Sequence, residues 1–278
     1  MCFLSRQLHT TTNHLLLSLA CADFVVGFLQ MPFEMVHLHG CWILGDFVCV
    51  LSYFLSFLMC SVSVGNMVLI SVDRYVAICD PMFYPVRVTV RRVQLCICLC
   101  WICSALHSIW ILREFLKRPD MYNSCYGECV VMIDYIEGSV DLVVTFIVPI
   151  VVIIALYMRV FVVAVSQARA MRSHIAAITQ QRSNIITAKK SEMKAARTLG
   201  AVVLVFLLCF SPYYCFSIAE ENTVVGAFSA AVQIWLLYFN SCINPLIYAF
   251  FYPWFRKSVR HIVTLQILQP GSCETNIR

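Results

Sequence analysis

The chain has 278 residues, of which 61% are hydrophobic and only 13% are charged, and its mean hydropathy is +0.81. Soluble domains carry about 25% charged residues, so this composition excludes a soluble domain and predicts an integral membrane protein. The net charge of +5 requires no nucleic-acid partner. Most of the 16 cysteines lie inside apolar runs, where they are expected to act as small packing residues.

Six apolar segments are long enough to cross a bilayer as helices, which takes about 20 residues each. They lie near residues 13–37, 46–79, 91–112, 138–166, 191–219 and 226–251. A short amphipathic helix is expected at about 253–264, followed by a tail at 265–278. We expect these segments to be helices, because the chain lacks the segments of about ten residues with alternating apolar and polar side chains that form a membrane barrel. We therefore predict an all-α transmembrane bundle that forms one domain over residues 1–278.

The charges of the connecting segments predict the orientation. Of the 20 Lys and Arg residues, 17 lie in segments 1–12, 74–92, 159–197 and 252–278. The positive-inside rule places these segments in the cytoplasm, and both ends of the chain with them. The opposite segments are acidic, and an acidic surface raises the local concentration of cations. A solvated acidic rim with no ligand would have the same composition.

Two motifs occur in order along the chain. The segment SVDRYVAICDP (71–81) ends the second span, and NSCINPLIY (240–248) lies in the last span. With LSLACAD (17–23) and Trp101, they resemble the rhodopsin-like (class A) G-protein-coupled receptors. The longer pattern NSCINPLIYAFFYPWF (240–255), together with RQLHTTTN (6–13) and CYGEC (125–129), is similar to the trace-amine-associated receptors.

This resemblance covers essentially the whole chain. It implies a seven-transmembrane receptor fold in which helices 2–7 are present and the first helix is absent, as in a truncated form. It also implies a plasma-membrane protein surrounded by lipid, with no enzymatic activity and no nucleic-acid partner. The expected function is an olfactory-type receptor for a small-molecule amine, coupled to a heterotrimeric G protein of the stimulatory type that raises cAMP.

The resemblance also implies which residues carry the signal. In the resting state Arg74 pairs with Asp73, and Glu192 occupies the position of a sixth-helix acid that often joins this pair. Activation releases Arg74 toward the G protein and toward Tyr157 and Tyr248. A snorkelling interfacial arginine is the alternative. Phe210 replaces the tryptophan usual in the family. The residues expected in activation are Asp73, Arg74, Tyr75, Glu192, Phe210, Asn244, Pro245, Tyr157 and Tyr248.

Two further features follow from the same resemblance. It implies that Asp23, Ser63, Asn240 and Asn244 surround an allosteric sodium ion, and no other metal or cofactor is expected. A polar cluster that holds the helices together is compatible with the same residues. The resemblance also implies a disulfide between Cys49 and Cys129, which leaves Cys125 without a pairing partner.

Asp141 is an acid inside the fourth apolar segment. A carboxylate there costs about 3 kcal/mol or more unless it faces a cavity or a partner. Aminergic receptors hold the ligand ammonium with an aspartate on the third helix, but Ser56 occupies that position. Asp141 lies eight residues before Pro149, about 12 Å along the helix axis, in the outer half of the fifth helix. As in some fish members of the family, Asp141 is therefore expected to hold the ammonium instead.

The remaining ligand-site residues are aromatic or polar. Aromatic rings can add cation–π contacts, and a threonine one turn after Asp141 can bind a polar group of the ligand. The expected set is Ser56, Thr145, Tyr213, Tyr214, Trp235 and Tyr238. One acid favours a monoamine, unless Glu137 or Glu220 supplies a second charge. The alternatives are a structural Asp141, an orphan or non-amine receptor, a non-functional truncated form, and a transporter.

Overall fold

The computed structural model describes residues 10–38, 42–117, 129, 131, 133–175, 200–201, 203–215, 227–251 and 253–264. All regular secondary structure in these ranges is helical, which confirms the predicted all-α bundle. Several residues of interest in the sequence lie outside the described residues: Glu192, Glu220 and Cys125. The tail at 265–278 and the side chain of Tyr248 also lie outside them.

Four helical stretches in the described part are long and apolar enough to cross a membrane: Thr11–His37, Gly45–Cys79, Val90–Ile111 and Tyr135–Val163. The first consists of α1 (Thr11–Val25), η2 (Val26–Gln30) and α2 (Met31–Leu38). The second is α3 (Gly45–Cys79) and the third is α5 (Val90–Ile111). The fourth joins α7 (Tyr135–Asp141), η4 (Leu142–Ile147) and α8 (Val148–Ile175). Two shorter apolar helices follow, Val203–Cys215 and Ala231–Ile247, the latter within α10 (Ala227–Phe251).

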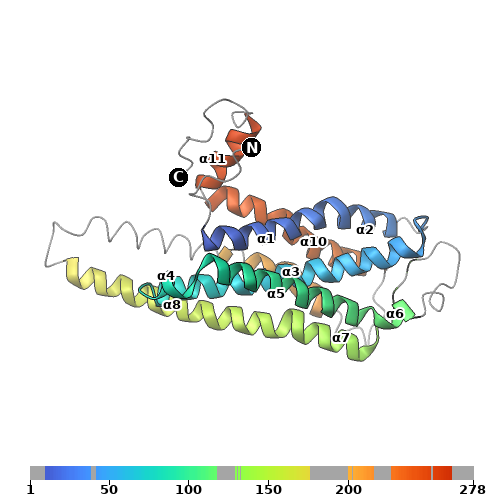
Figure 1. Ribbon diagram of the computed structural model, residues 1–278, viewed down its shortest axis with the longest axis horizontal. Helices are drawn as coiled ribbons and strands as arrows, with labels where there is room; N and C mark the ends of the chain where they lie inside the picture. Colours follow the sequence, from blue (N-terminus) through green and yellow to red (C-terminus); the bar gives the residue numbers. More distant parts are fainter. Residues whose placement is uncertain are drawn as a thin grey trace.

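The bundle is organised around α3, which packs against α1, α5 and α8. Figure 1 shows these helices lying side by side along the long axis of the molecule. Apolar side chains such as Val62, Met67 and Phe206 fill the space between them. Other large apolar side chains point outward, and Phe24 and Phe28 are 67% and 66% exposed. Such an apolar outer surface is expected of helices that face lipid.

Gly65 permits a close approach between α3 and α5. A Cβ atom at this position would lie 2.3 Å from Sγ of Cys100, well inside normal contact distance. A side chain at residue 65 would therefore require the Cys100 side chain, or the two helices, to move.

The two π-helical segments each end two residues before a proline. Segment η2 ends at Gln30, before Pro32, and η4 ends at Ile147, before Pro149. Proline lacks the N–H that would bond to the carbonyl four residues earlier, and its ring crowds that carbonyl. The preceding turn opens as a result, and such wide turns often occur at functional sites. Both wide turns are next to residues of the cavity described below.

At one end of the bundle, a small apolar cluster contains Trp42, Phe115, Cys49 and Cys129. A disulfide joins Cys49 to Cys129 with a Cα–Cα distance of 5.8 Å, which is the pairing that the resemblance implied. The short helix α6 (Arg113–Lys117) lies at the same end, and α4 (Tyr84–Arg87) lies between α3 and α5 at the other. The disulfide and α6 therefore mark one end of the bundle, and α4 marks the opposite end.

The last described helix is α11 (Pro253–Val263), at the position of the expected amphipathic helix. Figure 1 shows α11 turning away from the direction of the bundle after α10. Phe255 packs on the main apolar core, whereas Arg256, Lys257 and Arg260 are exposed. This distribution matches a helix that lies at a membrane surface with basic groups in water.

Candidate functional site

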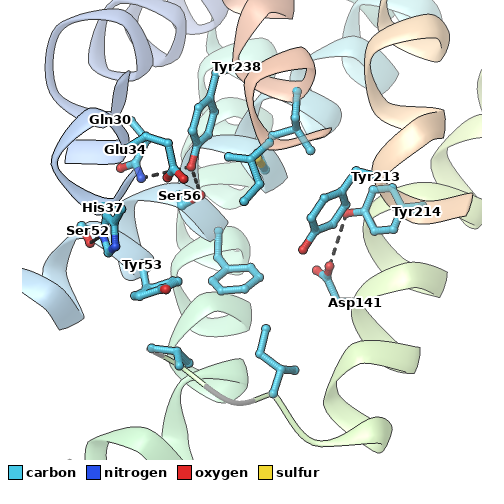
Figure 2. Close-up of a pocket in the computed structure, with 16 residues that line it drawn as sticks. Gln30, Glu34, His37, Ser52, Tyr53, Ser56, Asp141, Tyr213, Tyr214 and Tyr238 are labelled. Carbon is cyan, nitrogen blue, oxygen red and sulfur yellow. Dashed lines mark hydrogen bonds between the residues drawn. The ribbon is translucent and has the colours of Figure 1, made fainter. Parts of the chain in front are cut away.

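A cavity of about 240 Å³ opens between α2, α3, α7, the helix Val203–Cys215 and α10. Aromatic and polar side chains line it, including Tyr53, Tyr213, Tyr214 and Tyr238. Figure 2 shows these residues gathered around one space, with Asp141 on one side and Glu34 on the other. No Lys or Arg is among the lining residues in the described part of the chain. The cavity is therefore polar, aromatic and provided with two acids.

Asp141 lines this cavity and is 8% exposed. The Tyr214 hydroxyl donates to its Oδ2 over 3.3 Å, and Thr145 Oγ1 lies 3.1 Å from its Oδ1. The ring nitrogen Nε2 of His107 is 3.8 Å from the same Oδ1. The carboxylate thus has partners from α5, η4 and the helix Val203–Cys215.

His107 was not foreseen as part of the site. It lies in α5, which contributes no residue to the cavity lining among the described residues. An ionisable residue within an apolar span is itself a signal of function. The sequence ALHSIW (105–110) carried that signal, but it did not indicate which helix His107 would face.

Four of the six residues expected beside Asp141 line the cavity: Ser56, Tyr213, Tyr214 and Tyr238. Ser56 Oγ is 2.7 Å from the Tyr238 hydroxyl, so the third-helix position of the usual aspartate forms a hydrogen bond to α10. This bond links α3 to α10 within the cavity wall.

Thr145 and Trp235 are not among the described residues that line the cavity, and direct contact of either side chain with a ligand stays a prediction. The Thr145 hydroxyl is turned toward Asp141 and lies 2.6 Å from the Tyr214 hydroxyl. Ile234 and Tyr238 of α10 face the cavity because they are one turn apart, and the residue after Ile234 points elsewhere.

Glu34 and Gln30 form the opposite wall and were not predicted as site residues. Gln30, Glu34 and His37 occupy positions i, i+4 and i+7 of the first membrane stretch, and all three line the cavity. This spacing places side chains on one helix face. In the sequence, the only indication of this wall was the presence of these three polar residues on one face of an otherwise apolar segment.

Glu137 is engaged elsewhere. Its Oε1 lies 3.3 Å from Nε of Arg113, its side chain is 1% exposed, and it is not on the described lining. The Arg113 guanidinium also lies over the Trp110 ring at 4.7 Å. The buried Glu137 carboxylate therefore forms an ion pair with the partly exposed Arg113, and its role as a second ligand acid stays a prediction.

The family model for the 7 transmembrane receptor (rhodopsin family) matches residues 1–248. Trace amine-associated receptor 13c of Danio rerio is 36% identical over 98% of this chain and 82% of its own length. Trace amine-associated receptors 7b of Rattus norvegicus and 7f of Mus musculus are each 36% identical over 98% of this chain and 78% of their own lengths.

The chain belongs to the trace amine-associated receptor family. It is therefore a class A G-protein-coupled receptor, a multi-pass plasma-membrane protein and not an enzyme. The family recognised from the DRY motif (residues 73–75) and the NPxxY motif (residues 244–248) is confirmed.

At the far end of α3 from the disulfide, the receptor has a hydrogen-bond network around Asp73. Arg74 Nε donates to Asp73 Oδ2 over 3.1 Å, and Thr12 Oγ1 donates to the same oxygen over 3.0 Å. The Tyr84 hydroxyl donates to Oδ1 over 2.8 Å. Arg74 also contacts Thr12. Asp73 thus holds Arg74 between α1, α3 and α4, while Tyr75 next to it is half-buried.

A second polar cluster lies deeper in the receptor. Asn244 Nδ2 donates to both carboxylate oxygens of Asp23, at 3.2 and 3.1 Å, and joins α10 to α1. Ser63 and Asn240 are also buried. In the described structure, Oδ1 of Asn240 and Oδ1 of Asn244 are buried without a hydrogen-bond partner. Uncommitted buried oxygens of this kind fit the donor set of a hard cation.

Three other residues expected in activation, Phe210, Tyr157 and Pro245, lie in helices of the bundle. Phe210 is buried, and its ring centroid is 4.2 Å from that of Phe206. Tyr157 is half-buried against the main core, and Pro245 lies within α10. The geometry places these residues along the bundle, and their roles in activation stay predictions.

Proposed function

We propose that this receptor binds small cationic amines in the cavity and signals through a heterotrimeric G protein. Asp141 holds the ligand ammonium. The observation that carries the proposal is a buried carboxylate on a cavity whose described lining contains no Lys or Arg. The curated relatives are named trace amine-associated receptors, which supports an amine as the ligand.

The surroundings of Asp141 suit an ammonium group. The Tyr214 hydroxyl orients one carboxylate oxygen, and Thr145 lies against the other. An ammonium ligand would form a charge-assisted hydrogen bond with this carboxylate, which is stronger than a bond between neutral groups. The rings of Tyr213, Tyr214 and Tyr238 offer faces for cation–π contact. Ser56 carries no charge, so Asp141 replaces the aspartate of the third helix.

Arg74 is the proposed contact with the G protein. Release of Arg74 from Asp73 would make its guanidinium available at the cytoplasmic end of the bundle, where both chain ends also lie in this proposal. We propose a stimulatory G protein, a rise in cAMP and an olfactory role. The activation path includes Tyr75, Phe210, Tyr157, Pro245 and Tyr248.

Asp23, Ser63, Asn240 and Asn244 would hold a sodium ion in this proposal. The uncommitted oxygens of Asn240 and Asn244 support the site. A bound sodium ion would supply positive charge that balances the Asp23 carboxylate within the bundle.

The test is the response to simple primary amines in cells that carry the receptor and a stimulatory G protein. Asp141→Asn keeps the size of the side chain and removes its charge. Breaking a buried ion pair from one side costs about 3–5 kcal/mol, and each 1.4 kcal/mol is about tenfold in affinity. The potency of amines is therefore expected to fall by about two to three orders of magnitude.

Asp141→Glu is the matched control, because it keeps the charge and is expected to lose less potency. Surface amounts are measured for each variant by antibody binding. Unchanged potency in Asp141→Asn would mean that the carboxylate is structural, and the non-amine receptor would then be the better reading.

A further inference from the structure

The cavity carries a second acid at the end opposite Asp141. Glu34 of α2 lines the same space, and Figure 2 shows its carboxylate near Gln30 and Tyr238, across from Asp141 and Tyr213. The two acids come from different membrane helices, α2 and α7. A ligand that fills the space between these walls meets a carboxylate at each end.

Glu34 has no basic partner of its own in the described structure. The ion pairs there use other acids: Asp73, Asp80, Glu114, Glu137 and Asp141. Glu34 is half-buried within a membrane-spanning stretch. A carboxylate in such a position is costly unless a partner or a cavity meets it. The cavity is what meets Glu34, and it leaves space beside the carboxylate for a cationic group.

Gln30 points independently to a donor at the same end. It precedes Glu34 by four residues, it is 2% exposed, and it lines the cavity. Its Nε2 donates to the Tyr238 hydroxyl over 3.1 Å, which orients the amide. The Oε1 atom is left buried without a hydrogen-bond partner in the described structure. A buried acceptor without a donor is costly, and an ammonium group has three donors to offer.

We propose that the cavity binds a small dication, an α,ω-diamine, with one ammonium at Asp141 and the other between the Glu34 carboxylate and Gln30 Oε1. This inference rests on the proposed amine function of Asp141 and adds the second subsite. The volume of about 240 Å³ is below the range typical of drug-sized ligands, so a short diaminoalkane fits better than a long polyamine. The Tyr53 and Tyr238 rings line the same end of the cavity and offer faces to the second cation.

The experiment compares monoamines with diamines of equal chain length. The 278-residue chain is purified in lipid nanodiscs, and the Kd of each 1-aminoalkane and each α,ω-diaminoalkane is measured by calorimetry over a series of chain lengths. At the best length, the diamine is expected to bind about tenfold tighter than the monoamine, as one additional charge-assisted contact would give. A parent protein that binds both equally would overturn the second subsite.

Three variants separate the second subsite from the first. Glu34→Gln is expected to reduce the diamine preference to about twofold or less while leaving the Kd of monoamines nearly unchanged. Asp141→Asn is expected to weaken the binding of both monoamines and diamines, which tests the proposed function separately. Glu114→Gln is the matched control, because Glu114 of α6 is an acid that is not on the described lining and whose side chain is 49% exposed. It is expected to change neither Kd.

A shortened acid gives a readout that a purely structural role would not move. Glu34→Asp withdraws the carboxylate by one methylene, so the best diamine should become one carbon longer. If Glu34→Gln keeps the full preference for diamines, or if its affinities for monoamines and diamines fall equally, Glu34 is not the second subsite. Monoamine binding that still depends on Asp141 would leave the proposed function standing in that case.

Discussion

The Nε2 atom of His107 lies 3.8 Å from Oδ1 of Asp141, and the two side chains are only 13% and 11% exposed. His107 is thus the nearest basic group to the proposed ammonium site among the described ion pairs. A neutral imidazole leaves the Asp141 charge available to a ligand, whereas an imidazolium would neutralise it. A ligand ammonium at Asp141 would therefore share this carboxylate with His107 of α5.

Arg74→Ala should abolish the cAMP response to amines while leaving surface expression intact. Arg74 is bonded to Asp73 in this structure, and the Asp73 carboxylate also accepts bonds from Thr12 and Tyr84, which do not depend on the arginine. The network can therefore survive the substitution, whereas the proposed G-protein contact is lost. The measurement pairs cAMP with antibody binding at the cell surface, and normal signalling would exclude the proposed role of Arg74.

Cys129→Ser should lower the thermal stability of the purified receptor. The disulfide closes a segment with a sequence separation of 80 residues, and removing a native disulfide typically costs about 2–5 kcal/mol. The melting temperature in nanodiscs should drop, and surface expression with it. Cys215→Ser is a control, because Cys215 is a free and exposed thiol. Equal melting temperatures for the parent and Cys129→Ser would contradict a stabilising role for this bond.

Gly65→Ala should destabilise the receptor only when Cys100 is present. The new Cβ would lie 2.3 Å from Cys100 Sγ, so the two helices or the thiol must shift. Overpacking of this kind costs about 1–3 kcal/mol. In a Cys100→Ala background the obstructing sulfur is gone, and Gly65→Ala should be neutral or slightly stabilising because alanine favours helix. A melting-temperature cycle of the four proteins measures the coupling, and an additive result would show that no such contact exists.

Much of the architecture could be predicted from local patterns in the chain. Apolar runs of sufficient length must cross the membrane as helices, because lipid offers no partner for backbone polar groups. The DRY and NPxxY motifs in their order identify the family. Pro32 and Pro149 are visible in the sequence, and the wide turns η2 and η4 each end two residues before one of them. Asp141 stood out because a charge in an apolar run is costly.

The composition of the site depended on how the helices face each other. His107, Glu34 and Gln30 belong to helices whose rotation about their own axes no local pattern specifies, and side-chain packing between helices sets that rotation. Trp235 is not on the described lining because a turn of 100° per residue separates it from its cavity-facing neighbour Ile234. Thr145 shares a helix face with Asp141, but its hydroxyl lies against Asp141 and Tyr214. Spacing along one helix predicts which residues share a face, but contacts between helices determine which faces meet around the cavity.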